Sequence, residues 1–143
     1  MNSVENLHYA IGELAYAVAR ADGKVQQEER KIFHDIVTEE LQDKNYNFDV
    51  SDIIFHLMDK DKYDSKTTYE WAMRQIKMNS HYLSPELKEK FIRVMERIAE
   101  AFPPVNEAEV NLIEAFKEDI APIKGDPVYY DPHYLEKKII EKS

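Results

Sequence analysis

Apolar residues recur along most of this chain at intervals of three or four, the spacing of one face of an α-helix. Near the N-terminus the stripe runs through Leu7, Ile11, Leu14, Val18 and Ala21. A second stripe follows a short polar stretch, and its members are Ile32, Phe33, Ile36, Val37 and Leu41. Between the stripes lies Gly23, a residue that tolerates the positive φ at which helices commonly end. The pattern predicts two packed helices joined by a tight corner, residues 19–29.

This corner is repeated eighty positions further along the chain. The matched pairs are Ala19 with Ala99, Ala21 with Ala101, Val25 with Val105, and Glu29 with Glu109. Apolar positions on either side also match, so the sequence indicates two duplicated helix pairs. In the second copy, Phe102 stands in place of Asp22. Any polar chemistry at the corner is therefore expected in the first copy alone.

Helix start signals place the remaining elements. Ser65 and Ser84 are predicted to cap the fourth and fifth helices, and Asn106 begins the sixth. Glu109, three residues after Asn106, fits the supporting acid of a capping box. The predicted third helix carries an apolar stripe of Val50, Ile53, Ile54, Leu57 and Met58.

Together these elements predict an all-α fold, a single domain of six or seven helices built from two duplicated helix pairs. At 143 residues and 43% hydrophobic composition, the chain can bury one core without disulfide or metal support. The predicted domain covers residues 1–120. Residues 121–143 form a tail rich in proline and tyrosine, with a short helix from Asp131 through Leu135 and Ile139. The tail docks either on its own domain or on a neighbour, and the sequence leaves both alternatives open.

The charge balance narrows the choice of partners. The net charge is −9, from 28 acidic and 19 basic residues, which disfavours nucleic acid and anionic lipid and favours cations. No segment approaches eighteen consecutive apolar residues, so no membrane insertion is expected. The chain has no cysteine, which excludes disulfides and thiolate metal sites. We expect a soluble, cytoplasmic protein.

The residue inventory does not favour an enzyme. Only three glycines occur, too few to assemble a glycine-rich phosphate loop or a nucleophile elbow. The five histidines include no pair at the spacing of a helical zinc site. The sequence therefore predicts a non-catalytic protein.

Asp22 is the candidate functional residue, because an acid at a helix C-terminus faces the negative end of the helix dipole. One explanation is a bound divalent cation: the Asp22 carboxylate, Glu28 or Glu29, and free helix carbonyls would supply hard oxygen ligands. The alternative needs no metal. Asp22 would then accept hydrogen bonds from its own turn, and Glu29 would be a capping acid like Glu109.

The stretch Ala21-Asp22-Gly23, with glutamate six or seven residues after Asp22, resembles the corner of the tellurite-resistance TerB-like family. That resemblance implies an all-helical fold and a role in bacterial stress and metal resistance. The function it favours is a non-catalytic stress-response or scaffolding module that binds calcium, magnesium or zinc through Asp22, Glu28 and Glu29. The alternative is a metal-independent interaction module that uses the tail or an exposed groove. Either version implies a protein partner, and a homodimer is one form of it.

Overall fold

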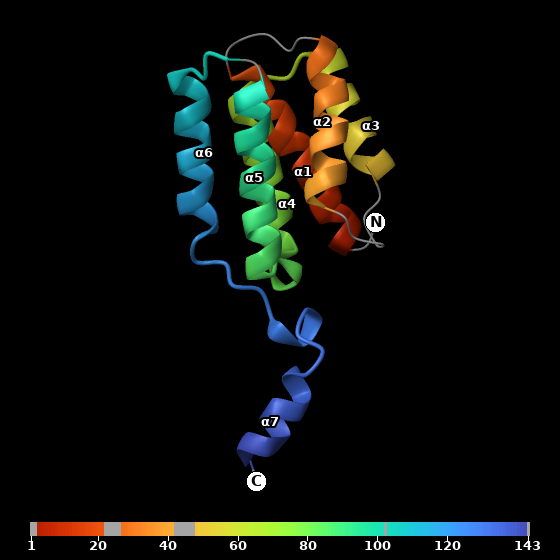
Figure 1. Ribbon diagram of the computed structural model, residues 1–143, viewed down its shortest axis with the longest axis vertical. Helices are drawn as coiled ribbons and strands as arrows, with labels where there is room; N and C mark the ends of the chain where they lie inside the picture. Colours follow the sequence, from red (N-terminus) through yellow and green to blue (C-terminus); the bar gives the residue numbers. More distant parts are fainter. Residues whose placement is uncertain (1–2, 22–26, 42–47, 102, 143) are drawn as a thin grey trace.

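The structure, a computed structural model, describes residues 3–21, 27–41, 48–101 and 103–142. Within these ranges the side chains of residues 4, 27–30, 48–52, 141 and 142 are left out of the description. Every regular element of the described ranges is helical, which confirms the predicted all-α class (Figure 1). The duplication of a helix pair stays a prediction. The α-helices are α1 (Ser3–Arg20), α2 (Gln27–Glu40), α3 (Phe48–Asp61), α4 (Ser65–Met78), α5 (Pro85–Ala101), α6 (Glu107–Ile120) and α7 (Tyr134–Lys142), and the short 3-10 turns are η1 (Ser80–Tyr82) and η2 (Pro127–Tyr129).

Helix α1 is the centre of the bundle. It packs against α3, α4, α5 and α6, and every residue from Ala10 to Ala19 is buried. A helix that is buried on all sides needs small residues so that its neighbours can approach closely. In α1 these small residues are Gly12, Ala15, Ala17 and Ala19. None of the described helices is long and apolar enough to cross a lipid bilayer.

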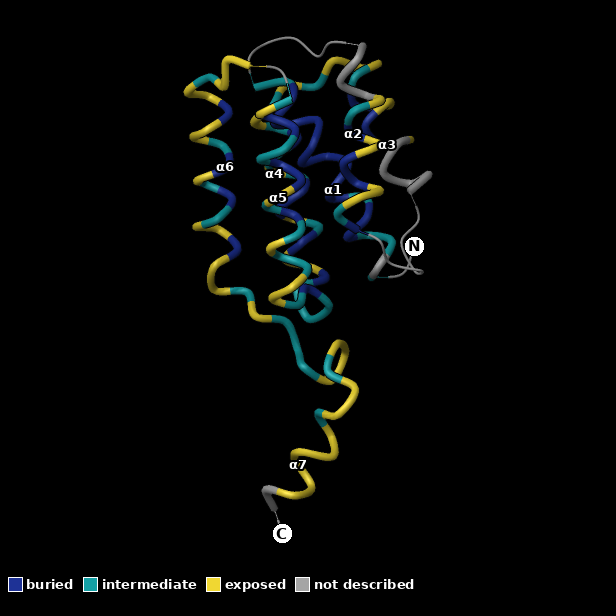
Figure 2. Tube along the Cα trace, viewed as in Figure 1, coloured by how far each residue is buried: buried dark blue, intermediate teal, exposed yellow. Residues whose placement is uncertain are grey.

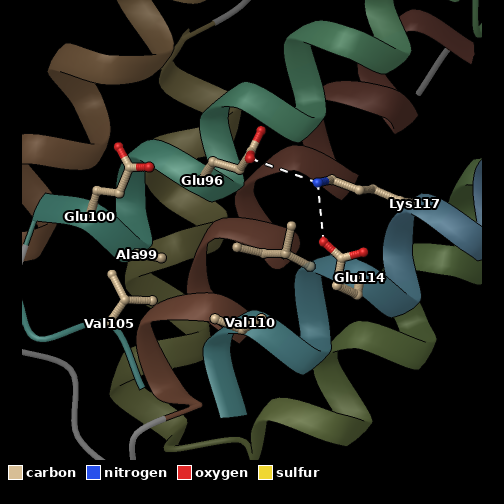
Figure 3. A pocket seen from close by; sticks show the side chains of 8 residues that line it. Glu96, Ala99, Glu100, Val105, Val110, Glu114 and Lys117 are labelled. Carbon is tan, nitrogen blue, oxygen red and sulfur yellow. Dashed lines mark hydrogen bonds and ion pairs between the residues drawn. The ribbon is translucent and has the colours of Figure 1, made fainter. Parts of the chain in front are cut away.

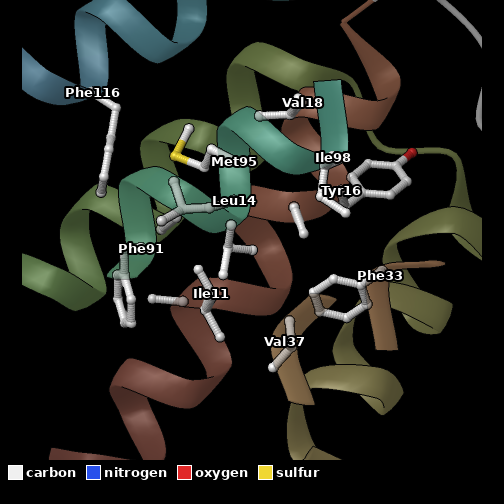
Figure 4. Close-up of a cluster of buried hydrophobic side chains, with 14 of the residues drawn as sticks. Ile11, Leu14, Tyr16, Val18, Phe33, Val37, Phe91, Met95, Ile98 and Phe116 are labelled. Carbon is white, nitrogen blue, oxygen red and sulfur yellow. The ribbon is translucent and has the colours of Figure 1, made fainter. Parts of the chain in front are cut away.

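The predicted stripe of α1 forms one wall of the core (Figure 4). Ile11, Leu14 and Val18 are fully buried and lie among side chains of three other helices. Figure 4 shows these neighbours, which are Phe33 and Val37 of α2, Phe91, Met95 and Ile98 of α5, and Phe116 of α6. All of them belong to one contiguous hydrophobic cluster, so the bundle has a single core.

Charged side chains join α2 to α5 at the edge of this core. Glu40 accepts hydrogen bonds from Arg93 Nε at 2.9 Å and from Arg97 Nη1 at 3.2 Å. Arg97 Nη2 also donates to Glu39 at 2.6 Å. Hydrogen bonding from Arg93 is the main reason that the pKa of Glu40 lies below its usual value. Both arginines of α5 therefore bind carboxylates of α2 within the bundle.

Helix α3 buries Ile54 and Met58 of the predicted apolar stripe, but it leaves Ile53 and Leu57 exposed. Ile53 and Leu57 are 55% and 41% exposed, whereas Phe55 is 1% exposed. The ring of Phe55 stacks on Phe33 with centroids 4.9 Å apart and meets Tyr16 edge-on at 5.9 Å. An aromatic ring buries more apolar area than an aliphatic side chain, so the aromatic cluster determines the rotation of α3.

The start of α4 also differs from the prediction. Asp64, not Ser65, caps this helix, because its carboxylate accepts the backbone N–H of Thr67 at 2.7 Å. The Ser65 hydroxyl instead donates to the carbonyl of Ala17 at 2.6 Å. Tyr16 donates to the Tyr63 carbonyl at the same end of α1. These two bonds fasten the C-terminal turn of α1 to the α3–α4 connection.

The segment after α6 turns back against the end of the bundle. Lys88 donates to the carbonyls of Ile120 and Ile123, and the Asp126 N–H donates to the His81 carbonyl at 2.8 Å. Gly125 has φ of +70°, and a Cβ there would lie 2.6 Å from the Leu83 carbonyl oxygen. Beyond this anchored stretch, α7 lies outside the bundle, and most of its residues are exposed (Figures 1 and 2).

Candidate functional site

The first corner, where the sequence predicts cation ligands, lies between α1 and α2. Asp22 falls outside the described residues, and Glu28 and Glu29 belong to α2 with side chains that are not described. Before the corner, the Ala21 N–H donates to the Val18 carbonyl at 3.1 Å. The proposed cation site therefore stays a prediction. Among the residues that the structure describes, no group of three or more histidine, aspartate or glutamate side chains could hold a metal ion.

The second corner shows where the acid at the matching position lies. Asn106 caps α6, and its side-chain oxygen accepts the Glu109 N–H at 2.8 Å, as the sequence predicts. Glu109 is the third residue of α6 and only 5% exposed. Helix α2 begins at Gln27, so Glu29 holds the same third position. The position in the helix fits the capping alternative for Glu29, and the choice between capping and cation binding stays a prediction.

A shallow groove between α5 and α6 begins beside the second corner (Figure 3). We call it the α5–α6 groove, and its cavity volume is about 130 Å³. Its apolar lining consists of Ala99, Val105, Val110 and Ile113. Three acids and a lysine complete it, and Lys117 Nζ lies 3.2 Å from Glu114 and 3.8 Å from Glu96 (Figure 3). Val105 and Val110 are 41% and 45% exposed, so the groove offers apolar surface with an acidic margin.

A larger pocket lies beside α1, and we call it the Glu13 pocket. Its volume is about 330 Å³, and its lining comes from α1, α3, α4 and the connection between the last two. Glu13 is 2% exposed, and its Oε1 has no hydrogen-bond partner among the described residues. The lining residues are Tyr9, Glu13, Met58, Tyr63, Trp71, Arg74, Gln75 and Met78.

The electrostatics of this pocket are dominated by burial of its carboxyl. Loss of water raises the pKa of Glu13 to about 8, because a carboxylate is poorly stabilised in an apolar environment. Burial also raises the pKa of Tyr9, and the nearby Glu13 adds to that shift. At neutral pH Glu13 is therefore mainly a neutral carboxylic acid.

Comparison with known protein families identifies the bundle. A family model described as tellurite resistance protein TerB matches residues 8–120. The chain belongs to the TerB family. No curated protein and no solved structure matched it.

The TerB region extends from the first half of α1 to the last residue of α6. The α5–α6 groove and the Glu13 pocket both lie inside this region, and α7 lies after it. Glu13 was not a candidate in the sequence analysis. The sequence feature that could have pointed to it is that Glu13 is the one charged residue between Ala10 and Ala19. Apart from the Tyr16 hydroxyl, the other residues of this stretch are apolar or small.

Proposed function

We propose that this TerB-family protein is a non-catalytic interaction module whose α5–α6 groove receives an amphipathic helix, and that α7 of a second copy is such a helix. The observation that carries the proposal is the exposure of apolar side chains on α7. Leu135 and Ile139 are 62% and 68% exposed, and a spacing of four residues puts them on one face. A helix with this pattern gains free energy when that face is covered.

The pattern of charged and apolar side chains supports the pairing of α7 with the groove. The groove offers exposed valine side chains beside Glu96, Glu100 and Glu114. Helix α7 carries Lys137 and Lys138 next to its apolar face. An amphipathic helix in an apolar groove is a common recognition mode, in which apolar anchors supply affinity and complementary charges set orientation.

The position of the tail favours a second copy as the source of the helix. The Asp126 N–H is bonded to the His81 carbonyl, and the Tyr129 ring lies 4.4 Å from the Tyr82 ring. These contacts hold the tail at the end of the bundle where α6 finishes (Figure 1). Val105 and Val110 lie at the opposite end of α6. Two copies can exchange their α7 helices reciprocally, which gives a closed dimer.

Single substitutions on the two surfaces test the proposal. We expect the wild-type protein to dimerise, and both Leu135→Asp and Val110→Asp to weaken the dimer at least tenfold, because each buries a charge in an apolar contact. The measurement is sedimentation velocity over a dilution series. Ala108→Asp, on an exposed position of α6 outside the groove, is the matched control and should leave association unchanged.

A mixing experiment separates a tail–groove contact from other dimers. The Leu135→Asp protein keeps its groove and the Val110→Asp protein keeps its tail, so an equimolar mixture should regain one of the two contacts and associate more strongly than either variant alone. A wild-type protein that stays monomeric, or variants that dimerise like the wild type, would remove the interaction proposal and leave the TerB assignment intact.

The first corner supports a second candidate function, cation binding by Asp22 with Glu28 or Glu29. The observation behind it is that α1 ends at Arg20, so Asp22 follows the negative end of the helix dipole. We expect calcium, magnesium, manganese or zinc to raise the melting temperature of EDTA-treated protein by on the order of ten degrees at saturating concentration. The shift should be absent in Asp22→Ala. If no ion raises the melting temperature, the capping alternative for Glu29 is correct.

A further inference from the structure

The Glu13 pocket is separate from the α5–α6 groove of the proposed helix docking. It contains a buried carboxyl oxygen that lacks a hydrogen-bond partner among the described residues. Glu13 is 2% exposed, yet its Oε1 has no hydrogen-bond partner among the described residues. A buried polar atom without a partner lowers stability, and folded proteins contain few of them. A carboxyl in this state at the wall of a 330 Å³ pocket indicates a bound group that would complete it.

Three of the seven other residues that line the pocket are aromatic. Tyr9, Tyr63 and Trp71 line it, and the Tyr63 and Trp71 rings meet edge-on with centroids 4.9 Å apart. Met58 and Met78 add polarizable sulfur. The faces of aromatic rings attract cations, and tryptophan attracts them most strongly. The aromatic rings and the Glu13 carboxyl therefore both favour a positively charged ligand.

The chemistry of the lining favours an organic cation over a metal ion. Calcium takes six to eight oxygen ligands, commonly several carboxylates, and magnesium keeps a shell of water. Glu13 is the sole carboxylate among the described residues that line the pocket, and the other side-chain oxygens there belong to two phenols and the Gln75 amide. An alkylated ammonium ion needs one counter-charge and an apolar, aromatic surface for its carbon atoms.

We propose that the Glu13 pocket binds a small organic ammonium ion, with the alkylated nitrogen among Tyr9, Tyr63 and Trp71 and its charge toward the Glu13 carboxyl. The pocket volume is within the usual range for small-molecule sites. Arg74 is the other charged group among the described lining residues, and it is exposed, so water and salt screen its repulsion of a cation. Helix α3 contributes Met58, which carries no charge.

Ammonium binding should be coupled to release of a proton. The pKa of Glu13 is about 8, and a cation beside the carboxyl stabilises its ionised form. Among the described residues, the other titratable or charged groups that line the pocket are Tyr9, Tyr63 and Arg74. Affinity for a ligand that does not titrate should rise about fivefold between pH 7 and pH 8, as the ionised fraction of Glu13 rises.

The test uses choline and its neutral carbon isostere, 3,3-dimethyl-1-butanol. These probes match in shape and differ in charge. Trp71 is the only tryptophan of the chain, so its fluorescence reports on the pocket directly. We expect choline to change Trp71 emission saturably, and the neutral alcohol to bind at least tenfold more weakly. Calorimetry in two buffers of different ionisation enthalpy should detect the released proton at pH 7.

Two variants assign the effect to Glu13. Glu13→Gln keeps the shape and removes the charge, and we expect it to bind choline at least tenfold more weakly with no proton release. Glu118→Gln, at an exposed position of α6, is the control and should bind like the wild type. Circular dichroism establishes that each variant is folded. The proposal is overturned if choline leaves wild-type Trp71 emission unchanged, if the neutral alcohol binds equally well, or if folded Glu13→Gln retains the affinity.

Discussion

Replacing Glu13 by glutamine is expected to remove a large pH dependence of stability. In the folded protein the pKa of Glu13 is about 8, against 4.5 for an unperturbed glutamate. Between these values the unfolded chain has lost the proton and the folded protein keeps it. Each pH unit in this window therefore lowers the free energy of unfolding by about 1.4 kcal/mol. The stability contributed by the neutral acid is complete below pH 4.5 and is lost as pH rises to about 8, roughly 3–5 kcal/mol in all.

Urea unfolding at pH 5, 6, 7 and 8 measures this effect. Glutamine does not titrate, so the difference in free energy of unfolding between Glu13→Gln and wild type should move in favour of the variant as pH rises. Glu118→Gln, on the exposed side of α6, should follow the wild-type profile. Parallel profiles for wild type and Glu13→Gln would show that Glu13 titrates alike in the folded and unfolded chains, which contradicts its burial.

Shortening Leu14 should produce the other large effect. Leu14 is fully buried in the middle of α1, among side chains of the surrounding helices (Figure 4). Leu14→Ala removes three carbon atoms from this core and leaves a cavity, which costs about 2–5 kcal/mol. For a domain of this length, the melting temperature should fall by on the order of ten degrees. Differential scanning calorimetry measures both quantities.

Leu135→Ala is the matched control for this substitution. It removes the same atoms from a leucine that is 62% exposed on α7. In protein diluted until it is monomeric, where α7 docks on no second copy, this exposed substitution should change the free energy of unfolding by less than about 0.5 kcal/mol. Equal destabilisation by the two variants would mean that α7 is packed as closely as α1, and would also remove the basis for proposing α7 as a docking helix.

The local features of this fold were predictable from sequence. The stripe from Leu7 to Val18 is buried, and Ser84 and Asn106 make the cap bonds expected of them at the start of α5 and α6. Each of these depends on residues within one or two turns of the same helix. The match to the TerB family over residues 8–120 confirms the family expected from the Ala-Asp-Gly corner.

The candidate sites were less accessible to sequence reasoning. The predicted cation ligands Asp22, Glu28 and Glu29 are untested, since the described residues do not include their side chains. Glu13 was not predicted at all. A glutamate one position before Leu14 lies beside the apolar stripe, and whether it meets water depends on which helices cover that side of α1.

The sequence by itself therefore determined the helical class, the cap residues of α5 and α6, the main apolar stripe and the acidic charge, because these follow from composition and short-range spacing. The tertiary structure alone decided that α3 and α4 cover the Glu13 side of α1, that Phe55 rather than Ile53 enters the core, and that α7 lies outside the bundle. Those outcomes depend on packing between helices that are far apart in the chain. The free energy of burial is proportional to the apolar surface area removed from water, whatever the sequence distance between the residues in contact.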